Sequence, residues 1–349
     1  MFSTYDPSDV TLLLKDITGR VEPQPASVRE ALIQRGTHYC EMLPLEYRPS
    51  SLYMRTYERA LALYKGRTAE AAAAVAEQIF REKGPNVALV SLARAGTSVG
   101  VLMKRWIRER HGAEVDHYSI SIIRGRGIDR NAMRYILSRH RAPELQFVDG
   151  WTGKGAIQRQ LDEAMRDWPG VDPGLAVLSD PANVARLCGT HDDFLIPSAC
   201  LNATVSGLLS RTFLRSDIIG PEDFHGAAFY AGLMGEDLTY AFIDAVAAAF
   251  PEKAPPGGMR EPGDGAIAEV AEIQRAFGIG SVNLVKPSIG EATRVLLRRL
   301  PWKVLVHSLD DAAHLGHLYQ LAREKDVPLV EYPLRHYRAC GLIRELADT

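Results

Sequence analysis

The sequence is short of cysteine, of net charge and of long apolar runs, and each shortage excludes a class of protein. Only four of its 349 residues are cysteine, and they form no CxxC pair, which argues against a disulfide framework or a zinc ribbon. A reducing cytoplasm is therefore the location we expect. The 41 basic and 43 acidic residues leave a formal charge of -2, so the chain as a whole is not built to coat nucleic acid. The most apolar stretch, residues 238–250, contains Asp244 and is too short to span a bilayer, which predicts no membrane role.

Composition divides the chain into two unequal parts. Residues 251–265 consist of proline, glycine and charged residues with no apolar period, which is typical of a linker. Residues 1–250 are long enough for a large domain, and residues 266–349 repeat a complete pattern of strands and helices on a smaller scale. The sequence therefore predicts a large domain, a linker and a small C-terminal α/β sandwich.

In the large domain, short apolar runs alternate with stretches of helical spacing. Strands are predicted at residues 87–91, 115–123 and 145–148, and helices at residues 98–110, 130–138 and 156–166. In the small domain, strands are predicted at residues 281–286, 303–307 and 327–332, and helices at residues 290–299, 311–325 and 334–340. This alternation predicts an α/β fold with a parallel, Rossmann-like sheet, whose ligands bind beyond the carboxyl ends of the strands.

Three loops at that edge carry groups suited to phosphate. Glycines and helix-start N–H groups mark the loop Thr152, Gly153, Lys154 and Gly155, while Asp149, followed by Gly150, is placed to accept hydrogen bonds from ligand hydroxyls. Small residues and one guanidinium mark the loop Arg94, Ala95, Gly96 and Thr97. Arg124 and Arg126 stand at a strand exit like a mobile cationic flap. The alternative for each is an ordinary turn, such as one capped by Thr152.

The order of these loops resembles the type I phosphoribosyltransferases. In that family Arg94, Ala95 and Gly96 would match the pyrophosphate loop, Arg124 and Arg126 the flexible loop, and residues 149–155 the signature loop. The signature loop here has a single acid and is one residue shorter than usual. The resemblance implies phosphoribosyl pyrophosphate as donor, a nucleobase-like acceptor and substrate-bound Mg²⁺, with Arg124 and Asp149 catalytic and the other loop residues binding substrate. Such chemistry needs positioned charge rather than a side-chain nucleophile.

A second resemblance concerns most of the chain, which is similar to bacterial proteins of tellurite-resistance and stress operons that carry the family name StiP cysteine protease. This resemblance makes the run of small and hydroxyl residues around Cys200 a candidate site. A protease would use Cys200 as nucleophile, His191 or His225 as base, and Asp192 or Asn202 to orient the base. The alternative is a buried structural cysteine. The ten histidines form no HExxH or similar spacing, so we expect no metal held by the protein itself.

The small domain resembles the Pelota and ribosomal kink-turn-binding family, at Glu291, Thr293, Arg294, Asp310 and Cys340-Gly341. The resemblance implies binding of structured RNA, with Lys286, Glu291, Arg294 and Arg298 as candidate contacts. A docking or dimerisation domain is the alternative, and the oligomeric state stays open.

The main expectation from the sequence is a cytoplasmic phosphoribosyltransferase that makes a nucleotide or nucleotide-like product, coupled to this RNA-binding-type domain. A non-catalytic sensor of a phosphoribosyl ligand and a cysteine protease are its alternatives.

Overall fold

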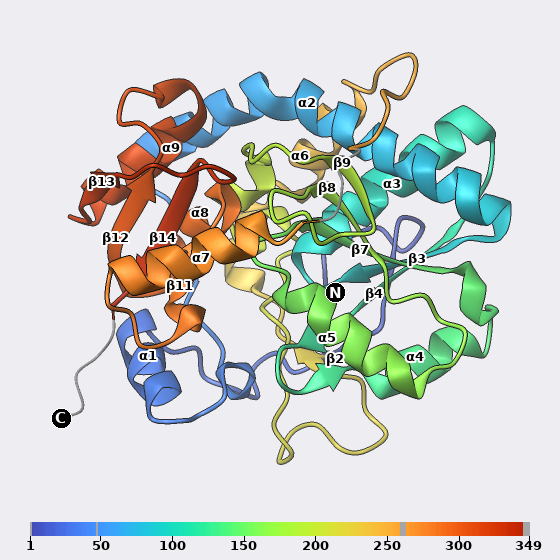
Figure 1. Ribbon diagram of the computed structural model, residues 1–349. Coiled ribbons are helices and arrows are strands. Elements are labelled where there is room, and N and C mark those ends of the chain that lie inside the picture. The colour runs from blue at the N-terminus through green and yellow to red at the C-terminus, as the bar shows by residue number, and fades with distance from the viewer. Residues whose placement is uncertain (1, 47, 259–262, 345–349) are drawn as a thin grey trace.

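The centre of the large domain is a six-stranded, fully parallel sheet, as the sequence predicts. The computed structural model describes residues 2–46, 48–258 and 263–344 (Figure 1). The strand order is β1-β4-β3-β7-β8-β9. The strands are β1 (Thr11–Leu12), β3 (Ala88–Leu92), β4 (Asp116–Ile120), β7 (Leu145–Trp151), β8 (Leu175–Ser179) and β9 (Leu187–Thr190).

Helices cover both faces of this sheet, which is why its central strands are apolar on both sides. One face is covered by α2 (Ser51–Lys83), α3 (Ala95–His111) and α6 (Thr239–Ala247), and the other by α4 (Arg130–Leu137) and α5 (Ala156–Ala164). The alanines of α2 from Ala69 to Ala76 are almost all buried, and Ala71 lies directly against Gly189 on β9, so a side chain at Gly189 would collide with the helix. Small residues thus let the long helix pack closely on the sheet edge.

The N-terminal region and the chain between β9 and α6 add smaller elements. These are β2 (Lys15–Asp16), which pairs with β10 (Gly226–Ala227), and α1 (Ala26–Gln34). The predicted strand 115–123 is broken after β4, and its last residues form β5 (Ile122–Ile123), which pairs with β6 (Gly127–Ile128) as a short antiparallel hairpin. The predicted cationic flap is therefore the turn of this hairpin.

The C-terminal domain is a mixed four-stranded sheet in the order β11-β14-β12-β13 with helices against it. Its elements are α7 (Gly265–Ala276), β11 (Val285–Pro287), α8 (Ile289–Arg298), β12 (Pro301–Val306), α9 (Ala312–Glu324), β13 (Leu329–Glu331) and β14 (Ala339–Ile343). The predicted helix at 334–340 is wrong. Residues 339–343 form a fully buried strand between β11 and β12, where burial on both faces favours an extended chain.

The two domains are closely joined. Helix α2 runs along both of them in Figure 1, and its Tyr64 hydroxyl donates to the carbonyl of Ala313 on α9, at 2.8 Å. The Tyr337 hydroxyl donates to the carbonyl of Gly153, also at 2.8 Å. Part of the predicted linker, residues 259–262, lies outside the described residues, as do residues 345–349 of the predicted C-terminal domain. Among the described helices, none combines the length and the apolar character needed to cross a membrane.

Candidate functional site

The largest cavity near the predicted loops, about 830 Å³, lies between the two domains. Nine of the predicted site residues line it: Arg124, Asp149, Thr152, Gly153, Lys154, Gly155, Lys286, Glu291 and Arg294. Two of the three predicted loops, at Arg124 and at residues 149–155, therefore converge on one cavity, whereas the loop that begins at Arg94 does not reach it. The C-terminal domain closes the cavity.

Charges in this cavity are mostly basic and strongly desolvated. Burial lowers the pKa of Lys154 to about 7 and that of Lys286 to about 8, with neighbouring cations adding to the effect on Lys154. Burial raises the pKa of Asp149 to about 6, although Arg294 opposes the shift. Burial also lowers the pKa of Arg211, to about 9, and its guanidinium lies over the Tyr39 ring, 4.3 Å from the centroid. Keeping these buried basic side chains protonated therefore costs free energy.

The donors of the predicted phosphate loop are committed to protein partners. The Lys154 ammonium donates to the main-chain carbonyls of Val282 and Val285 in the C-terminal domain, the latter at 2.8 Å. The Thr152 hydroxyl donates to the Asp180 carboxylate at 2.5 Å. Gly155, with a φ of +71°, is the left-handed residue that starts α5. This loop therefore fastens the C-terminal domain to the sheet.

The loop that begins at Arg94 also has its groups engaged within the protein. The buried Arg94 guanidinium pairs with Glu46 at 3.0 Å and donates to the carbonyl of Leu209. A Cβ on Gly96 would lie 2.5 Å from the carbonyl oxygen of Val148, so close packing of α3 on β7 requires glycine there.

The remaining predicted loop residues lie at several different places. Ala95 lines a small second cavity with Arg94, and the Thr97 hydroxyl shares a 2.7 Å hydrogen bond with Ser119. Arg126 pairs with Glu41 at 3.0 Å at the surface. Gly150 is buried on β7 and donates its N–H to the Asp149 carboxylate at 2.8 Å.

The candidate RNA contacts face the large domain. Arg294 lies over the ring of Trp151, 4.2 Å from its centroid, and Arg298 donates to the side-chain carbonyl of Asn202. Glu291 approaches Gly153, and burial opposes its ionisation while Arg294 and Lys286 hold its pKa below the usual value. With Lys286 in the cavity wall, all four residues contribute to the interface between the domains.

Lys154 makes stability depend on pH. Because its pKa is about 7 in the folded chain and 10.5 is its ordinary value, the unfolded chain binds more protons between these two pH values. Its contribution to the free energy of unfolding should rise with pH across this window, by up to about 1.4 kcal/mol per pH unit. The free energy of unfolding, measured with urea at several pH values, should rise less steeply with pH in Lys154→Met than in the native protein. Lys65→Met, a control at an exposed position, should keep the native pH dependence. An unchanged slope in Lys154→Met would contradict the assignment.

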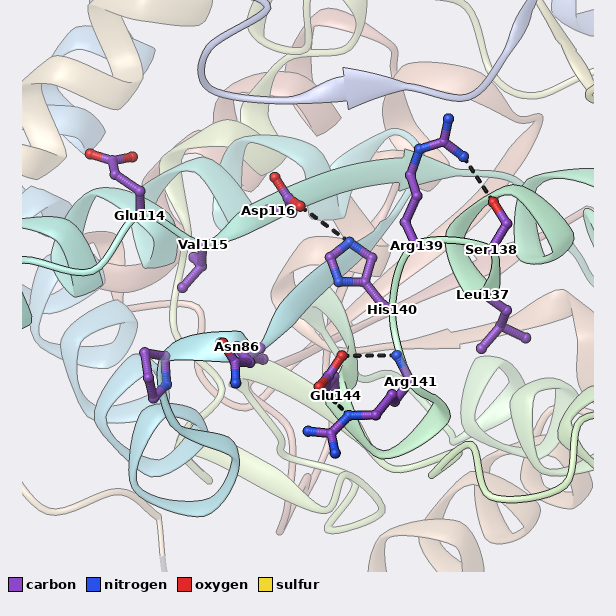
Figure 2. A pocket seen from close by; sticks show the side chains of 12 residues that line it. Asn86, Glu114, Val115, Asp116, Leu137, Ser138, Arg139, His140, Arg141 and Glu144 are labelled. Carbon is purple, nitrogen blue, oxygen red and sulfur yellow. Dashed lines mark hydrogen bonds and ion pairs between the residues drawn. The ribbon is translucent and has the colours of Figure 1, made fainter.

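Another cavity, of about 700 Å³, lies at the amino ends of the strands, opposite the predicted loops (Figure 2). It is lined by residues that precede β3, β4 and β7, and its charged groups pair locally: His140 with Asp116 at 3.2 Å and Arg141 with Glu144 at 2.7 Å. No cysteine lines it.

Among the described residues, two of the four free cysteines have no imidazole at hydrogen-bond distance. Cys200 and Cys340 are fully buried, and burial raises the pKa of each thiol to about 12. Cys40 is also fully buried, and its sulfur lies 2.9 Å from Nδ1 of His38. That nitrogen also caps a short 3-10 helix by accepting from the Cys40 N–H, and Nε2 of the same ring lies 3.0 Å from the carbonyl oxygen of Arg124. The two histidines proposed for Cys200 have other partners: His225 bonds the Ser121 hydroxyl at 2.8 Å, and His191 lies against Cys188.

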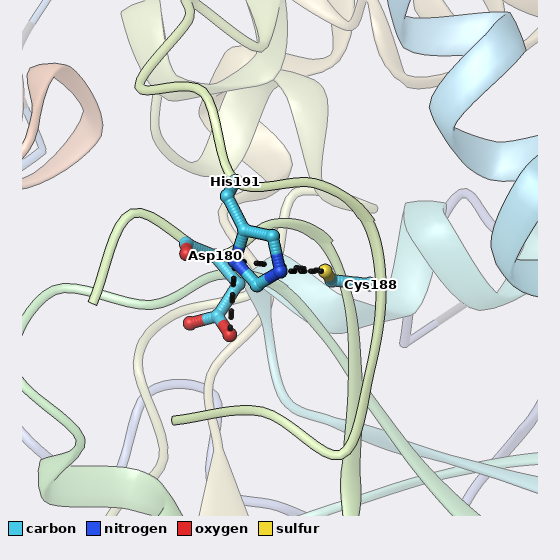
Figure 3. Close-up of side chains that lie close together, drawn as sticks. All are labelled: Asp180, Cys188 and His191. Carbon is cyan, nitrogen blue, oxygen red and sulfur yellow. Dashed lines mark hydrogen bonds and ion pairs between the residues drawn. The ribbon is translucent and has the colours of Figure 1, made fainter. Parts of the chain in front are cut away.

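Cys188, His191 and Asp180 form one cluster at the end of β8 and β9 (Figure 3). The Cys188 sulfur lies 3.5 Å from Nε2 of His191, and Nδ1 of His191 lies 3.0 Å from the main-chain oxygen of Asp180 and 3.8 Å from its carboxylate. A carbonyl oxygen only accepts, so Nδ1 carries the proton and Nε2 presents its lone pair to the thiol. This is the tautomer of the neutral ring that a general base needs.

The local chain explains why the three groups meet. Asp180 directly follows β8, and its fully buried carboxylate accepts from the main-chain N–H groups of Val184 and Ala185, at 3.1 and 3.0 Å, which fixes the turn into β9. His191 directly follows β9, so its ring lies at the same end of the strands as Asp180. The His191 side chain keeps 16% of its surface exposed, which leaves a route to solvent.

The same three groups could also hold a metal ion. Their donor atoms all lie within 4.8 Å of one another, and they are the only such set of three in the described parts of the chain. Thiolate, imidazole and carboxylate are zinc ligands. The hydrogen bonds that occupy the Asp180 carboxylate, from Thr152, Val184 and Ala185, favour an orienting acid instead.

Comparison with known proteins identifies the family. Residues 3–247 match the family described as "Tellurite-like stress resistance cysteine protease StiP", and the protein "Cysteine protease StiP" of Acinetobacter baylyi (strain ATCC 33305 / BD413 / ADP1) is 34% identical over 364 residues, covering 98% of this chain and 94% of the relative. The chain belongs to the StiP family. Residues 265–345 match a second family, "PELOTA RNA binding domain", so this StiP family member carries both parts expected from the sequence resemblances.

Solved structures add little. Two crystal structures of a hypoxanthine-guanine phosphoribosyltransferase (hpt-2) from Bacillus anthracis, one with HEPES in its active site, align with 35% of this StiP family chain and 71% of theirs. Identity is 15% and 14%, and the TM-score is 0.26 for both. Likeness at that level carries nothing about fold or activity.

The main functional expectation is therefore wrong. StiP family membership, over the full length of the chain, indicates a cysteine protease rather than a phosphoribosyltransferase. The physical reason lies in the loops: Arg94, Thr152 and Lys154 offer their donors to Glu46, Asp180 and the C-terminal domain. Phosphoribosyl pyrophosphate, the nucleobase-like acceptor and Mg²⁺ were expectations of that reaction, and nothing in the structure tests them as ligands.

Proposed function

We propose that this protein is a cysteine peptidase whose nucleophile is Cys188, with His191 as general base and Asp180 as the group that orients the base. The observation that carries the proposal is the thiol 3.5 Å from an imidazole nitrogen whose other nitrogen lies 3.0 Å from the main-chain oxygen of Asp180 and 3.8 Å from its carboxylate. The His38 ring beside Cys40 has the carbonyl of Arg124 at the corresponding position instead of an acidic residue. A nucleophile, a base within reach and a third group that fixes the base are the parts that acyl transfer requires. Membership of the StiP family supports the same reaction class.

The chemistry follows from these positions. His191 Nε2 takes the thiol proton, and the Cys188 sulfur attacks the peptide carbonyl carbon to form a tetrahedral intermediate. The intermediate collapses to a thioester as the C–N bond breaks, and His191 returns the proton to the leaving amine. Water, deprotonated by His191, then hydrolyses the thioester and releases the free thiol. The Asp180 main-chain oxygen and carboxylate stabilise the imidazolium at each stage.

The resting thiol is neutral. Burial, together with the nearby Asp180 charge, raises the pKa of Cys188 to about 12, while the hydrogen bond to Gly258 opposes the shift. The thiol therefore loses its proton only as the base accepts it, in the general-base mode of serine enzymes rather than as a standing thiolate pair.

The test is to hydrolyse a labelled unstructured protein with the full chain while a thiol-alkylating reagent is added in portions. Activity should fall in step with alkylation of Cys188, located by peptide mass spectrometry, and a metal chelator should leave the activity unchanged. Loss of activity in step with Cys40, Cys200 or Cys340 would overturn the assignment. Stoichiometric zinc, with activity lost on chelation, would instead make the cluster a metal site.

Two features extend this proposal. The four cysteines are free thiols, which supports the cytoplasm as its location. The match of residues 265–345 supports structured RNA as a ligand of the C-terminal domain. Since its candidate contacts face the large domain, RNA contact through them would require the domains to part. Footprinting of structured RNA tests this by comparing the protection given by the native full chain with that given by Arg294→Ala.

A further inference from the structure

The outer edge of β9 is occupied by the chain's own linker. β9 is the last strand of the sheet in the described part of the chain, so the structure describes no partner strand for its main-chain groups on the outer side. The carbonyl of Cys188 accepts there from the N–H of Gly258 at 2.9 Å and from the side-chain amide of Gln78 at 3.0 Å. The Cys188 sulfur also lies 3.8 Å from the Gly258 carbonyl oxygen. The linker thus lies on the nucleophile's own residue as an added strand does on a sheet edge.

Glycine is essential to this placement at two successive positions. A Cβ on Gly258 would lie 2.6 Å from the Cys188 sulfur and 3.1 Å from Cδ2 of His191. A Cβ on Gly257 would lie 1.8 Å from the Gln78 amide nitrogen and 2.9 Å from the Cys188 carbonyl oxygen. Side chains at either position would collide with the groups that hold the segment. The space beside the thiol therefore admits only a chain segment whose residues have no side chains.

The segment also accounts for the seclusion of the thiol. Cys188 is only 3% exposed although it stands on an edge strand, and its sulfur is in contact with the linker. His191, on the same side, keeps part of its surface open. A peptide in trans can reach the sulfur only after residues 257–258 leave.

We propose that Gly257-Gly258 is a resting, inhibitory occupant of the Cys188 site, and that the site takes extended peptide segments with two adjacent glycines. The occupancy rests on geometry alone, whereas the statement about substrates rests on the proposed peptidase function. Displacement of the linker is then the step that activates the enzyme.

The test measures the alkylation rate of Cys188 in the full-length protein by peptide mass spectrometry, with the fully buried Cys200 as internal reference. Gly258→Ala should raise the rate about tenfold or more, because a buried thiol reacts only in the fraction of molecules that has opened locally. Gly257→Ala should act in the same direction. Lys253→Ala, which changes only an exposed linker side chain, is the matched control and should keep the native rate. A thermal melt shows that each variant is folded.

A second arm tests the peptide class. In Gly258→Ala, millimolar acetyl-Ala-Pro-Pro-Gly-Gly-amide should restore protection of Cys188, and the matching Ala-Ala peptide should not. Native alkylation rates in folded samples of both glycine variants would overturn the proposal, as would equal protection by the two peptides. Where occupancy is found but no Gly-Gly peptide is hydrolysed, the peptidase proposal fails and the occupancy stands. Where Cys188-dependent hydrolysis coexists with native alkylation rates, the peptidase stands and the occupancy fails.

Discussion

Cys188→Ser should lower kcat/KM for peptide hydrolysis by about 10³-fold or more, because a serine hydroxyl at this position lacks the acidity and nucleophilicity of a thiol. The substitution keeps the size of the side chain and its hydrogen bond toward His191, 3.5 Å away, so the fold should be retained. His191→Gln should cost a similar factor. Since the two residues act as one unit, the double variant should lose no more than either single variant.

Matched cysteine variants make this prediction specific. Cys200→Ala removes a buried thiol with no imidazole at hydrogen-bond distance among the described residues. Cys40→Ala removes a thiol 2.9 Å from His38, whose other ring nitrogen meets the carbonyl of Arg124 instead of an acidic residue. On the proposed mechanism both variants should keep kcat/KM within about threefold of the native value. Initial rates with a labelled unstructured protein measure all five variants. If Cys200→Ala is the inactive variant, Cys200 is the nucleophile and the Cys188 cluster has another role.

Asp193→Ala should lower the free energy of unfolding by about 3 kcal/mol or more, because it leaves buried main-chain donors without partners. Its carboxylate accepts from the N–H of Ile289 at 3.0 Å and from that of Arg338 at 2.9 Å. Ile289 is the first residue of α8, so the carboxylate also faces the positive end of that helix. Burial raises the pKa of Asp193 to about 7, and urea unfolding at pH 8 therefore measures the ionised form.

The neighbouring acid supplies the control. Asp192 pairs with Arg67 at the surface, with 60% of its side chain exposed, so Asp192→Ala should cost less than about 1 kcal/mol. Hydrogen exchange distinguishes the two variants further, since only Asp193→Ala should accelerate exchange at the amides of Ile289 and Arg338. Equal losses in both variants would show that Asp193 does not fasten the domains together.

Much of the fold follows from the sequence because alternation of strand and helix is a local pattern. The runs at residues 87–91 and 145–148 appear as the central strands β3 and β7, with their helices directly after them. The strand at 339–343 is missed because its neighbours in the sheet, β11 and β12, come from distant segments, and helical spacing at 334–340 is only a weak local preference. The break after β4 depends on the hairpin, which the sequence alone does not reveal.

The candidate site is harder to predict for a definite physical reason. The sequence offers Cys200, with its small neighbours, as the alternative nucleophile and names His191 among the candidate bases, but it does not pair His191 with Cys188. Residues three apart on a strand point to opposite faces, so Cys188 and His191 would not meet if β9 continued. They meet because β9 ends at Thr190 and the chain turns back. Asp180 belongs to another strand end, which only the sheet order brings close.

Helix α2 gives the two domains a shared rigid axis. Its 33 residues form a rod of about 50 Å. About 21 Å of that rod separates Tyr64, which contacts α9, from Gln78, whose side-chain amide donates to β9 beside the thiol. Because a hydrogen-bonded helix is stiff along its axis, we expect a movement of the C-terminal domain along α2 to displace Gln78 as well. The long alanine-rich helix thus connects α9 of the C-terminal domain to the strand that carries Cys188.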